Sequence, residues 1–180
     1  MRFSEIPVAG AWLIDLEPIN DERGFFARTF CVEEFAAHGL DTSVVQCNMS
    51  LTRATGTIRG LHYQVAPAAE TKLVRVVRGA VYDVIVDLRA GADLQCYAVE
   101  LSAENRRSLF VPEGCAHGFQ TLAADTCVEY QMGAPYTPGT DRGVRFADPR
   151  LAIAWPKSII QVSERDRSWP LIADRIDLLT

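Results

Sequence analysis

Short runs of apolar residues that alternate with polar ones recur along this chain, and turn-forming residues separate them. In the clearest example, residues 72–89, apolar positions recur at every second residue on both sides of Gly79. Such alternation is typical of β-strands with two different faces. We therefore predict a β-hairpin that turns at Arg78-Gly79, with one face in the core and the face bearing Asp83 and Asp87 in polar surroundings.

Most of the remaining chain has the same character. Further strand-like segments lie at residues 44–50, 95–102, 108–111 and 126–132. Helical periodicity is limited to residues 31–38, so helices do not alternate with strands and a βαβ fold is disfavoured. After Pro135 the chain is rich in turn formers, although Ser163 with Asp166 resembles a capped helical turn. These patterns predict a mainly β barrel or sandwich with a few short helices, wrapped by a tail that begins at about residue 150.

Composition limits the type of protein. The chain has 180 residues, of which 48% are apolar and 23% are charged, so we expect residues 1–180 to form one packed domain. No signal-like segment or long apolar run is present, which predicts a cytoplasmic protein without a membrane partner. The net charge of −5 and the lack of a basic run argue against a nucleic-acid partner. The five cysteines form no Cys-x-x-Cys pair and are expected to be free thiols.

Two segments contain the histidines that lie in strand-like surroundings. They are GTIRGLHYQ at 56–64, with His62, and FVPEGCAHGF at 110–119, with His117. Together they resemble the two halves of a cupin. Metal-binding cupins carry a second histidine where this chain has Gln64, and a carboxamide oxygen is a poor substitute for imidazole toward a transition metal. We therefore expect neither a metal nor another cofactor.

Several polar residues of these segments have two readings. His62 and Tyr130 are equally typical of satisfied core residues and of an acid-base pair. Lys72 suits either a surface position or a buried cation beside His62, and Arg23 suits either a solvated loop or a phosphate clamp. Arg59, Gln64 and Lys72 lie near His62, and strand alternation lets residues separated by even steps share a face, which would direct several polar groups into one cavity. A barrel interior rarely contains so many polar groups without a ligand.

A larger set of motifs, in order along the chain, carries a family resemblance. The motifs are DERGFF, VQCNMS, GTIRGLHYQ, KLVRVVRGAVYDVIVDLR, LSAENRRSLFVPEGCAHGF, VEYQM, RGVRFADP and AWP. From about residue 6 to about residue 171, the chain resembles the dTDP-4-dehydrorhamnose 3,5-epimerase family. The resemblance implies a cupin-type jelly-roll fold and a homodimer in which the N-terminal region of one subunit helps to build its partner's pocket. It also implies a nucleotide-linked 4-keto-6-deoxy sugar as substrate.

The resemblance implies roles for individual residues. His62 is expected to be the general base, Asp166 to orient it, Lys72 to stabilise an enolate and Tyr130 to be the general acid. No metal or redox cofactor is needed for such proton transfer. The residues expected to contact the substrate are Arg23, Phe26, Arg28, Gln46, Asn48, Arg59, Gln64, His117 and Tyr136. Arg23 and Arg59 are expected at the phosphates, with Arg23 acting in trans.

Two departures from the family pattern leave alternatives open. Arg28 stands where an acidic residue is expected near the nucleobase, and Cys47 stands where Asp is common. The leading hypothesis is epimerisation at C-3 and C-5 of dTDP-4-dehydro-6-deoxy-D-glucose. The alternatives are epimerisation at one carbon or of a different nucleotide sugar, a non-catalytic sugar-nucleotide-binding cupin, and a metal-dependent cupin oxygenase, which Gln64 makes the weakest.

Overall fold

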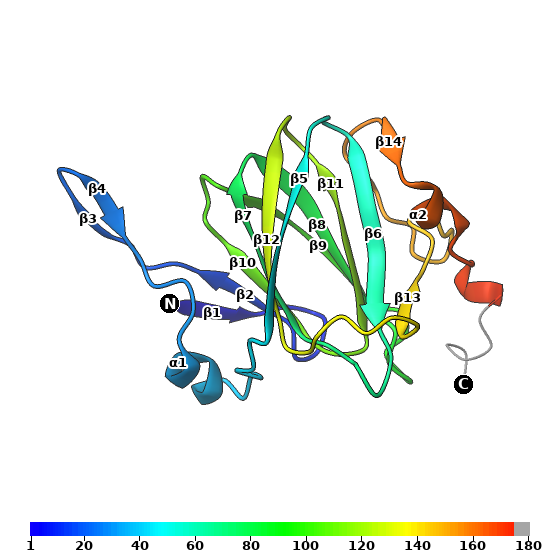
Figure 1. Cartoon of the computed structure of the whole chain (residues 1–180), viewed down its shortest axis with the longest axis horizontal. Coiled ribbons are helices and arrows are strands. Elements are labelled where there is room, and N and C mark those ends of the chain that lie inside the picture. Colours follow the sequence, from blue (N-terminus) through cyan, green and yellow to red (C-terminus); the bar gives the residue numbers. More distant parts are fainter. Residues whose placement is uncertain (175–180) are drawn as a thin grey trace.

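The computed structural model describes residues 1–174, which form two large, mainly antiparallel sheets that face each other (Figure 1). The mainly β jelly-roll class predicted from the sequence is confirmed. The predicted domain end at residues 175–180 lies outside the described residues. In order across the first sheet, the strands are β1 (Arg2–Glu5), β2 (Trp12–Asp15), β10 (Ser108–Val111), β7 (Lys72–Arg78), β12 (Thr126–Met132) and β5 (Gln46–Thr52).

The second sheet carries the other half of the barrel. Its strands are β13 (Asp141–Gly143), β6 (Thr57–Gln64), β11 (Cys115–Thr121), β8 (Ala80–Asp87) and β9 (Cys96–Ser102), and β14 (Gln161–Val162) pairs with β6 in parallel. The remaining elements are a separate hairpin of β3 (Ile19–Asp21) and β4 (Gly24–Phe26), and the helices α1 (Val32–Ala37), α2 (Glu164–Ser168) and the 3-10 turn η1 (Ile172–Asp174). Figure 1 shows the β3–β4 hairpin extending away from the sheets as an arm.

The predicted hairpin at Gly79 is wrong, because β7 and β8 belong to different sheets. β8 pairs with β11 and β9, whereas β7 pairs with β10 and β12. Gly79 has φ +77°, and a Cβ there would lie 2.4 Å from the Thr126 hydroxyl oxygen. The glycine therefore makes a tight corner that carries the chain across the barrel. Alternation identified both strands correctly but contains no information about which partners they take.

The space between the sheets is filled by an apolar core at one end. Val74, Val76, Ile85, Leu109 and Phe119 are among its fully or almost fully buried members. Because side chains of a strand alternate between faces, the first residue of β7 points inward with Val74 and Val76. The alternation therefore places the ammonium of Lys72, the first residue of β7, at the other end of the same interior.

The outer face of the second sheet is covered by the C-terminal segment. Val84 and Val86 pack there with Leu151, Ile172 and the partly buried Trp155. The opposite face of β8 points into the barrel. Asp83 and Asp87, which were expected in polar surroundings, are therefore 0% and 3% exposed and pair with His117 and Arg89.

Short helices lie where the sequence indicated them. α1 falls within the predicted segment 31–38 and inserts Phe35 against Leu73 and Phe110. α2 has the predicted cap, because the Ser163 hydroxyl accepts a hydrogen bond from the Asp166 amide at 3.0 Å. Among the described residues, no helix is long and apolar enough to cross a membrane.

Candidate active site

A bulge in β6 brings two pocket residues to the same side of the second sheet. In the pairing with β11, His62 lies opposite His117 and Arg59 lies opposite Phe119, so β6 has one more residue in this interval. Strict alternation would place Arg59 and His62, three residues apart, on opposite faces. Because of the extra residue, both side chains line one cavity.

Two glycines allow this bulge. A Cβ on Gly60 would lie 2.5 Å from the Gly118 Cα, and Gly60 has φ +125°, which side chains disfavour. A Cβ on Gly118 would in turn lie 2.6 Å from the Arg59 carbonyl oxygen. The close approach of the two backbones therefore positions the residues on either side of Gly60.

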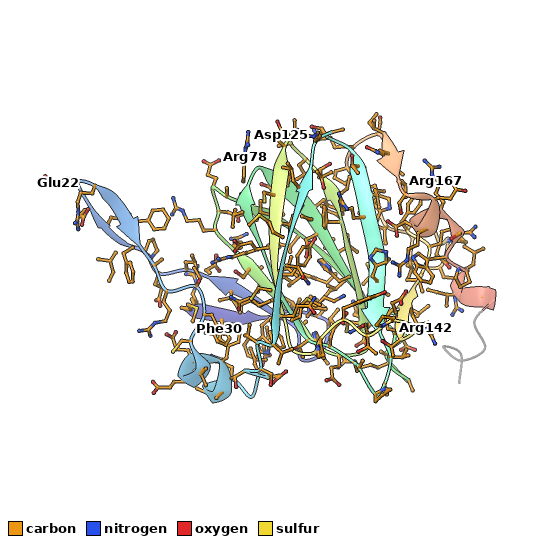
Figure 2. All side chains as sticks on the ribbon, in the orientation of Figure 1. Glu22, Phe30, Arg78, Asp125, Arg142 and Arg167 are labelled. Atoms are coloured by element: carbon orange, nitrogen blue, oxygen red, sulfur yellow. The ribbon has the colours of Figure 1, made fainter. Side chains whose placement is uncertain are left out.

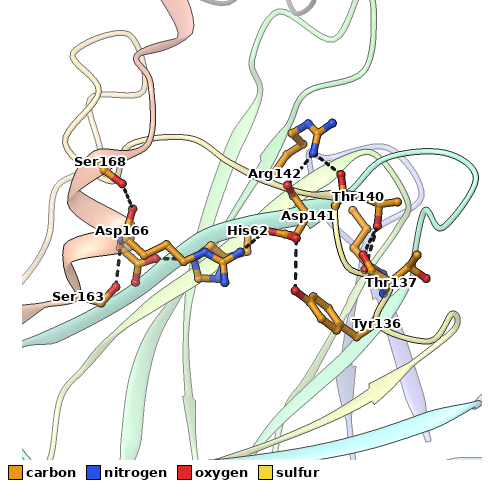
Figure 3. A network of polar contacts seen from close by, with 12 residues as sticks. His62, Tyr136, Thr137, Thr140, Asp141, Arg142, Ser163, Asp166 and Ser168 are labelled. Carbon is orange, nitrogen blue, oxygen red and sulfur yellow. Dashed lines mark hydrogen bonds and ion pairs between the residues drawn. The ribbon is translucent and has the colours of Figure 1, made fainter.

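His62 forms a dyad with Asp166 of α2, shown in Figure 3. The His62 Nε2 and Asp166 Oδ1 atoms are 2.5 Å apart, and the Gly60 amide donates to the other carboxylate oxygen at 3.4 Å. Burial alone would raise the pKa of Asp166, but the His62 ring and the Ser163 hydroxyl hold it below its ordinary value. With Nε2 facing the carboxylate, the ring nitrogen Nδ1 is left to exchange a proton with a ligand.

Lys72 is a buried cation at the inner end of the cavity. Its ammonium lies 3.1 Å from a Glu70 carboxylate oxygen and donates to the His62 carbonyl oxygen at 2.9 Å. Burial lowers the pKa of Lys72, although Glu70 and Asp83 oppose the shift. A partly desolvated ammonium of this kind can stabilise negative charge that develops on a ligand.

Tyr130 projects into the cavity from the first sheet. Its hydroxyl lies 3.3 Å from the Ser50 hydroxyl, and its ring packs edge-on against the His117 ring at 6.2 Å. Burial raises the pKa of Tyr130 to about 12. The phenol therefore keeps its proton at neutral pH and can act as an acid.

His117 pairs with the carboxylate of Asp83, which was expected to face polar surroundings. Its Nε2 atom is 2.9 and 3.0 Å from the two Asp83 oxygens, and both residues are buried. The signal was present in the sequence, since Asp83 lies two residues from both Val81 and Ile85, which are buried on the same face of β8. The prediction that Asp83 faces polar surroundings is wrong, because the carboxylate is buried and paired with His117.

These residues line a cavity of about 700 Å³ between the two sheets, a size suited to a small-molecule ligand. The predicted site residues in its wall are Asn48, Arg59, His62, Lys72, His117, Tyr130 and Asp166. At the rim, Arg59 is braced by the Thr52 hydroxyl at 2.8 Å and by the Leu51 carbonyl oxygen at 3.3 Å. The four residues predicted to be catalytic, which are far apart in the sequence, thus line one pocket.

Three predicted contact residues lie next to this wall instead of in it. Gln64 is 4% exposed and holds the segment after β12, accepting from the Thr137 amide at 2.8 Å. Gln46 accepts from the Tyr136 amide at 3.1 Å and donates to Asn48 at 3.0 Å. Gln64 therefore has a structural position, while Tyr136 stands exposed at the surface.

Three further predicted residues lie on or beside the arm, away from this pocket. Figure 2 shows the arm with Glu22 at its tip, far from the sheets. Arg23 pairs with Asp21 next to it, and Arg28 pairs with Glu34 at 2.8 Å. Phe26 is 74% exposed. Within one described chain these residues do not reach the cavity.

The pocket also contains residues that the sequence reasoning missed, notably Met132 and Arg165. Met132 lies two residues after Tyr130 on the same strand, so the period of two could have found it. Arg165 precedes Asp166 on α2 and pairs with Asp141 of β13. In Figure 3, the contacts around Asp141 border the His62–Asp166 pair, so this network forms one edge of the site.

The arrangement fits acid-base chemistry on a small polar ligand. A histidine with a carboxylate partner lies on the second sheet, a protonated tyrosine lies on the first, and the buried ammonium of Lys72, also from the first sheet, reaches the His62 carbonyl oxygen. Within residues 1–174, no group of three or more His, Cys, Asp and Glu side chains is placed to hold a metal ion.

Comparisons with known proteins agree with this geometry. Residues 5–174 match the family model described as dTDP-4-dehydrorhamnose 3,5-epimerase. A curated relative of that name from Sinorhizobium fredii is 43% identical, covering 97% of this chain and 91% of its own length. A dTDP-4-dehydrorhamnose 3-epimerase from Streptomyces niveus is 36% identical, over 98% and 86%. The Legionella pneumophila dTDP-6-deoxy-D-glucose-3,5-epimerase, solved with dTDP-4-keto-L-rhamnose, has a TM-score of 0.90 at 34% identity, over 98% and 96%.

Proposed function

This chain belongs to the dTDP-4-dehydrorhamnose 3,5-epimerase family, and we propose that it inverts C-3 and C-5 of dTDP-4-dehydro-6-deoxy-D-glucose to give dTDP-4-dehydro-L-rhamnose. The observation that carries the proposal is the placement of a base and an acid on facing sheets of one pocket. His62 comes from β6 of the second sheet and Tyr130 from β12 of the first. Inversion requires a proton to leave one face of the sugar ring and another to arrive at the opposite face.

The first step is removal of a proton next to the C-4 ketone. The His62 imidazole takes the proton from C-3 or C-5, and the electron pair of the broken C–H bond moves to form a C=C bond as the ketone becomes an enolate. The Asp166 carboxylate stabilises the imidazolium that results, at the 2.5 Å contact described above. The ammonium of Lys72 stabilises the negative charge on the enolate oxygen.

The second step is protonation of the same carbon from the other face. Tyr130 donates its phenolic proton to the carbon as the enolate returns to the ketone, which inverts the centre. A pKa of about 12 keeps the phenol protonated before this step. Solvent then removes the proton from His62 and returns one to Tyr130, and the cycle repeats at the second carbon. No net oxidation occurs.

We propose that the protein is a homodimer in which the arm of one subunit completes the pocket of the other. Support comes from Arg23, Phe26 and Arg28, which the family resemblance assigns to substrate binding although none of them lines the cavity of its own chain. Large apolar side chains on and near the arm, such as Ile19 at 72% exposed, are available for burial against a partner.

Mixing two inactive variants tests this arrangement. Arg23→Ala and His62→Ala should each have little epimerase activity alone. A mixed dimer, however, contains one pocket that carries neither change. At random association we expect roughly a quarter of wild-type activity, since half of the dimers are mixed and half of their pockets are intact. Activity that stays at the average of the two parents would contradict a shared pocket.

Epimerisation at one carbon is the second candidate, and the 36% identical relative named as a 3-epimerase favours keeping it. The test is identification of the product formed from dTDP-4-dehydro-6-deoxy-D-glucose by NMR. Inversion at both carbons supports the double epimerase, whereas inversion at C-3 alone supports the second candidate. Binding without any inversion would indicate a non-catalytic sugar-nucleotide-binding protein and would overturn the proposal.

A further inference from the structure

The residue that follows α2, Trp169, lies against the ring of His62. The two ring centroids are 6.2 Å apart with an interplanar angle of 63°, an edge-on contact. Trp169 comes three residues after Asp166, so one short segment carries to the imidazole both the carboxylate, seen beside His62 in Figure 3, and the indole. One segment therefore touches the His62 ring at its Nε2 atom and also at its side.

The indole occupies space that an absent side chain leaves open. Gly143 of β13 lies opposite His62 in the sheet, and a Cβ on Gly143 would lie 2.4 Å from the Trp169 Cε2 atom. Gly143 does not have a left-handed φ, so the space for the ring, and not the backbone conformation, requires glycine here.

Other contacts hold Trp169 in place. Its carbonyl oxygen accepts a hydrogen bond from the Arg145 Nε atom at 2.9 Å. The Arg165 guanidinium carbon lies 5.3 Å from the ring centre, within the range of a cation–π contact. The position of the indole is thus fixed by the hydrogen bond to the Trp169 carbonyl oxygen, by the space that Gly143 leaves for the ring, and by the Arg165 guanidinium over the ring.

The contact with the indole matters because the His62 ring is partly exposed to solvent. The His62 side chain is 39% exposed, and the hydrogen bond at Nε2 fixes one atom of the ring while leaving rotation about that contact. Rotation would change the direction in which Nδ1 faces the sugar. We propose that Trp169 is a positioning residue for the general base, because its indole holds the plane of the His62 imidazole against Asp166. This inference rests on the proposed function, in which His62 removes the proton.

A double-mutant cycle between Trp169 and Gly143 tests the inference. Trp169→Ala removes the ring, and Gly143→Ala adds a methyl group that must displace it. We expect each change to lower kcat about ten- to a hundredfold with KM within a factor of about two, because small errors in reacting geometry are costly. Gly143→Ala added to Trp169→Ala should cause no further loss, since the ring that the methyl group displaces is gone. Trp169→Phe should restore most of kcat.

Trp155→Ala is the matched control. Trp155 also belongs to the C-terminal segment and covers the outer face of the second sheet. There it packs on Tyr82 and donates to the Phe146 carbonyl oxygen at 3.0 Å. Its removal should lower the unfolding temperature without lowering kcat. If Trp155→Ala lowers kcat as much as Trp169→Ala, or if the Trp169 and Gly143 effects simply add, the role of Trp169 is only structural and the inference is overturned.

An activity-independent measurement separates this inference from the proposed function. The proton shared by His62 and Asp166 should give a low-field NMR signal in the wild type, identified by its absence in His62→Ala. We expect that signal to remain sharp in Trp169→Phe and to broaden by solvent exchange in Trp169→Ala. A wild-type protein with no epimerase activity would defeat the proposed function but leave this test standing. A sharp signal in Trp169→Ala, or full kcat in an active protein, would defeat the inference.

Discussion

Asp166→Asn gives a sharp test of the dyad, because it removes the charge behind His62 and keeps the shape of the side chain. The carboxylate faces His62 Nε2 at 2.5 Å, and a hydrogen bond to a charged group contributes about 1.5–3 kcal/mol. The His62 side chain is 39% exposed, so solvent screening favours the lower half of this range. Because about 1.4 kcal/mol is a factor of ten in rate, we expect a loss of about ten- to fortyfold in kcat.

The assay is the rate of hydrogen loss from the substrate in deuterated water, followed by NMR with thermal unfolding measured in parallel. Asp148→Asn is the matched control, since Asp148 is a buried carboxylate of the C-terminal segment that accepts from the Ile172 amide at 2.6 Å outside the pocket. The control should lower stability and leave kcat within a factor of about two. A folded Asp166→Asn protein with wild-type kcat would refute the assigned role of the carboxylate.

Three further perturbations have distinct expected results. Tyr130→Phe should still exchange hydrogen for deuterium through His62 but should form inverted product at least a hundredfold more slowly, because the acid is missing; inverted product at the normal rate in the NMR assay would rule out Tyr130 as the acid. Lys72→Met leaves the buried Glu70 carboxylate without its cation and should lower the free energy of unfolding in denaturant by about 3–5 kcal/mol, with partial recovery on adding Glu70→Gln; an unchanged midpoint would contradict the buried pair. Since the pKa of Asp166 is depressed in the folded protein, its stabilising contribution is present above the unfolded value of about 4 and is lost as the pH falls through the folded value. The acid-side loss of stability should therefore be smaller in Asp166→Asn than in the wild type, and identical pH curves would contradict it.

Local sequence patterns predicted most of the strands but not their partners. The alternation around Gly79 located β7 and β8, yet the tight corner at Gly79 sends them into opposite sheets. Pairing depends on contacts between residues far apart in the chain, such as the close approach of Gly60 and Gly118. The same limit applies to the face of Asp83, since alternation defines two faces without stating what covers each.

The candidate site was predictable mainly where family motifs marked it. His62, Lys72, Tyr130 and Asp166 were expected together and line one cavity. Trp169 was not expected, because its relation to His62 depends on how the segment after β14 folds over β13. Nothing in the local sequence around Trp169 indicates that contact.

Incorporation of deuterium from the solvent shows whether His62 removes protons from both carbons of the sugar. Wild-type protein would be incubated with dTDP-4-dehydro-6-deoxy-D-glucose in deuterated water beside His62→Ala, and deuterium at C-3 and C-5 would be followed by NMR. We expect deuterium at both carbons with the wild type and, because base catalysis is lost, a rate at least a hundredfold lower with His62→Ala. Equal incorporation by the two proteins, or none by the wild type, would contradict this expectation.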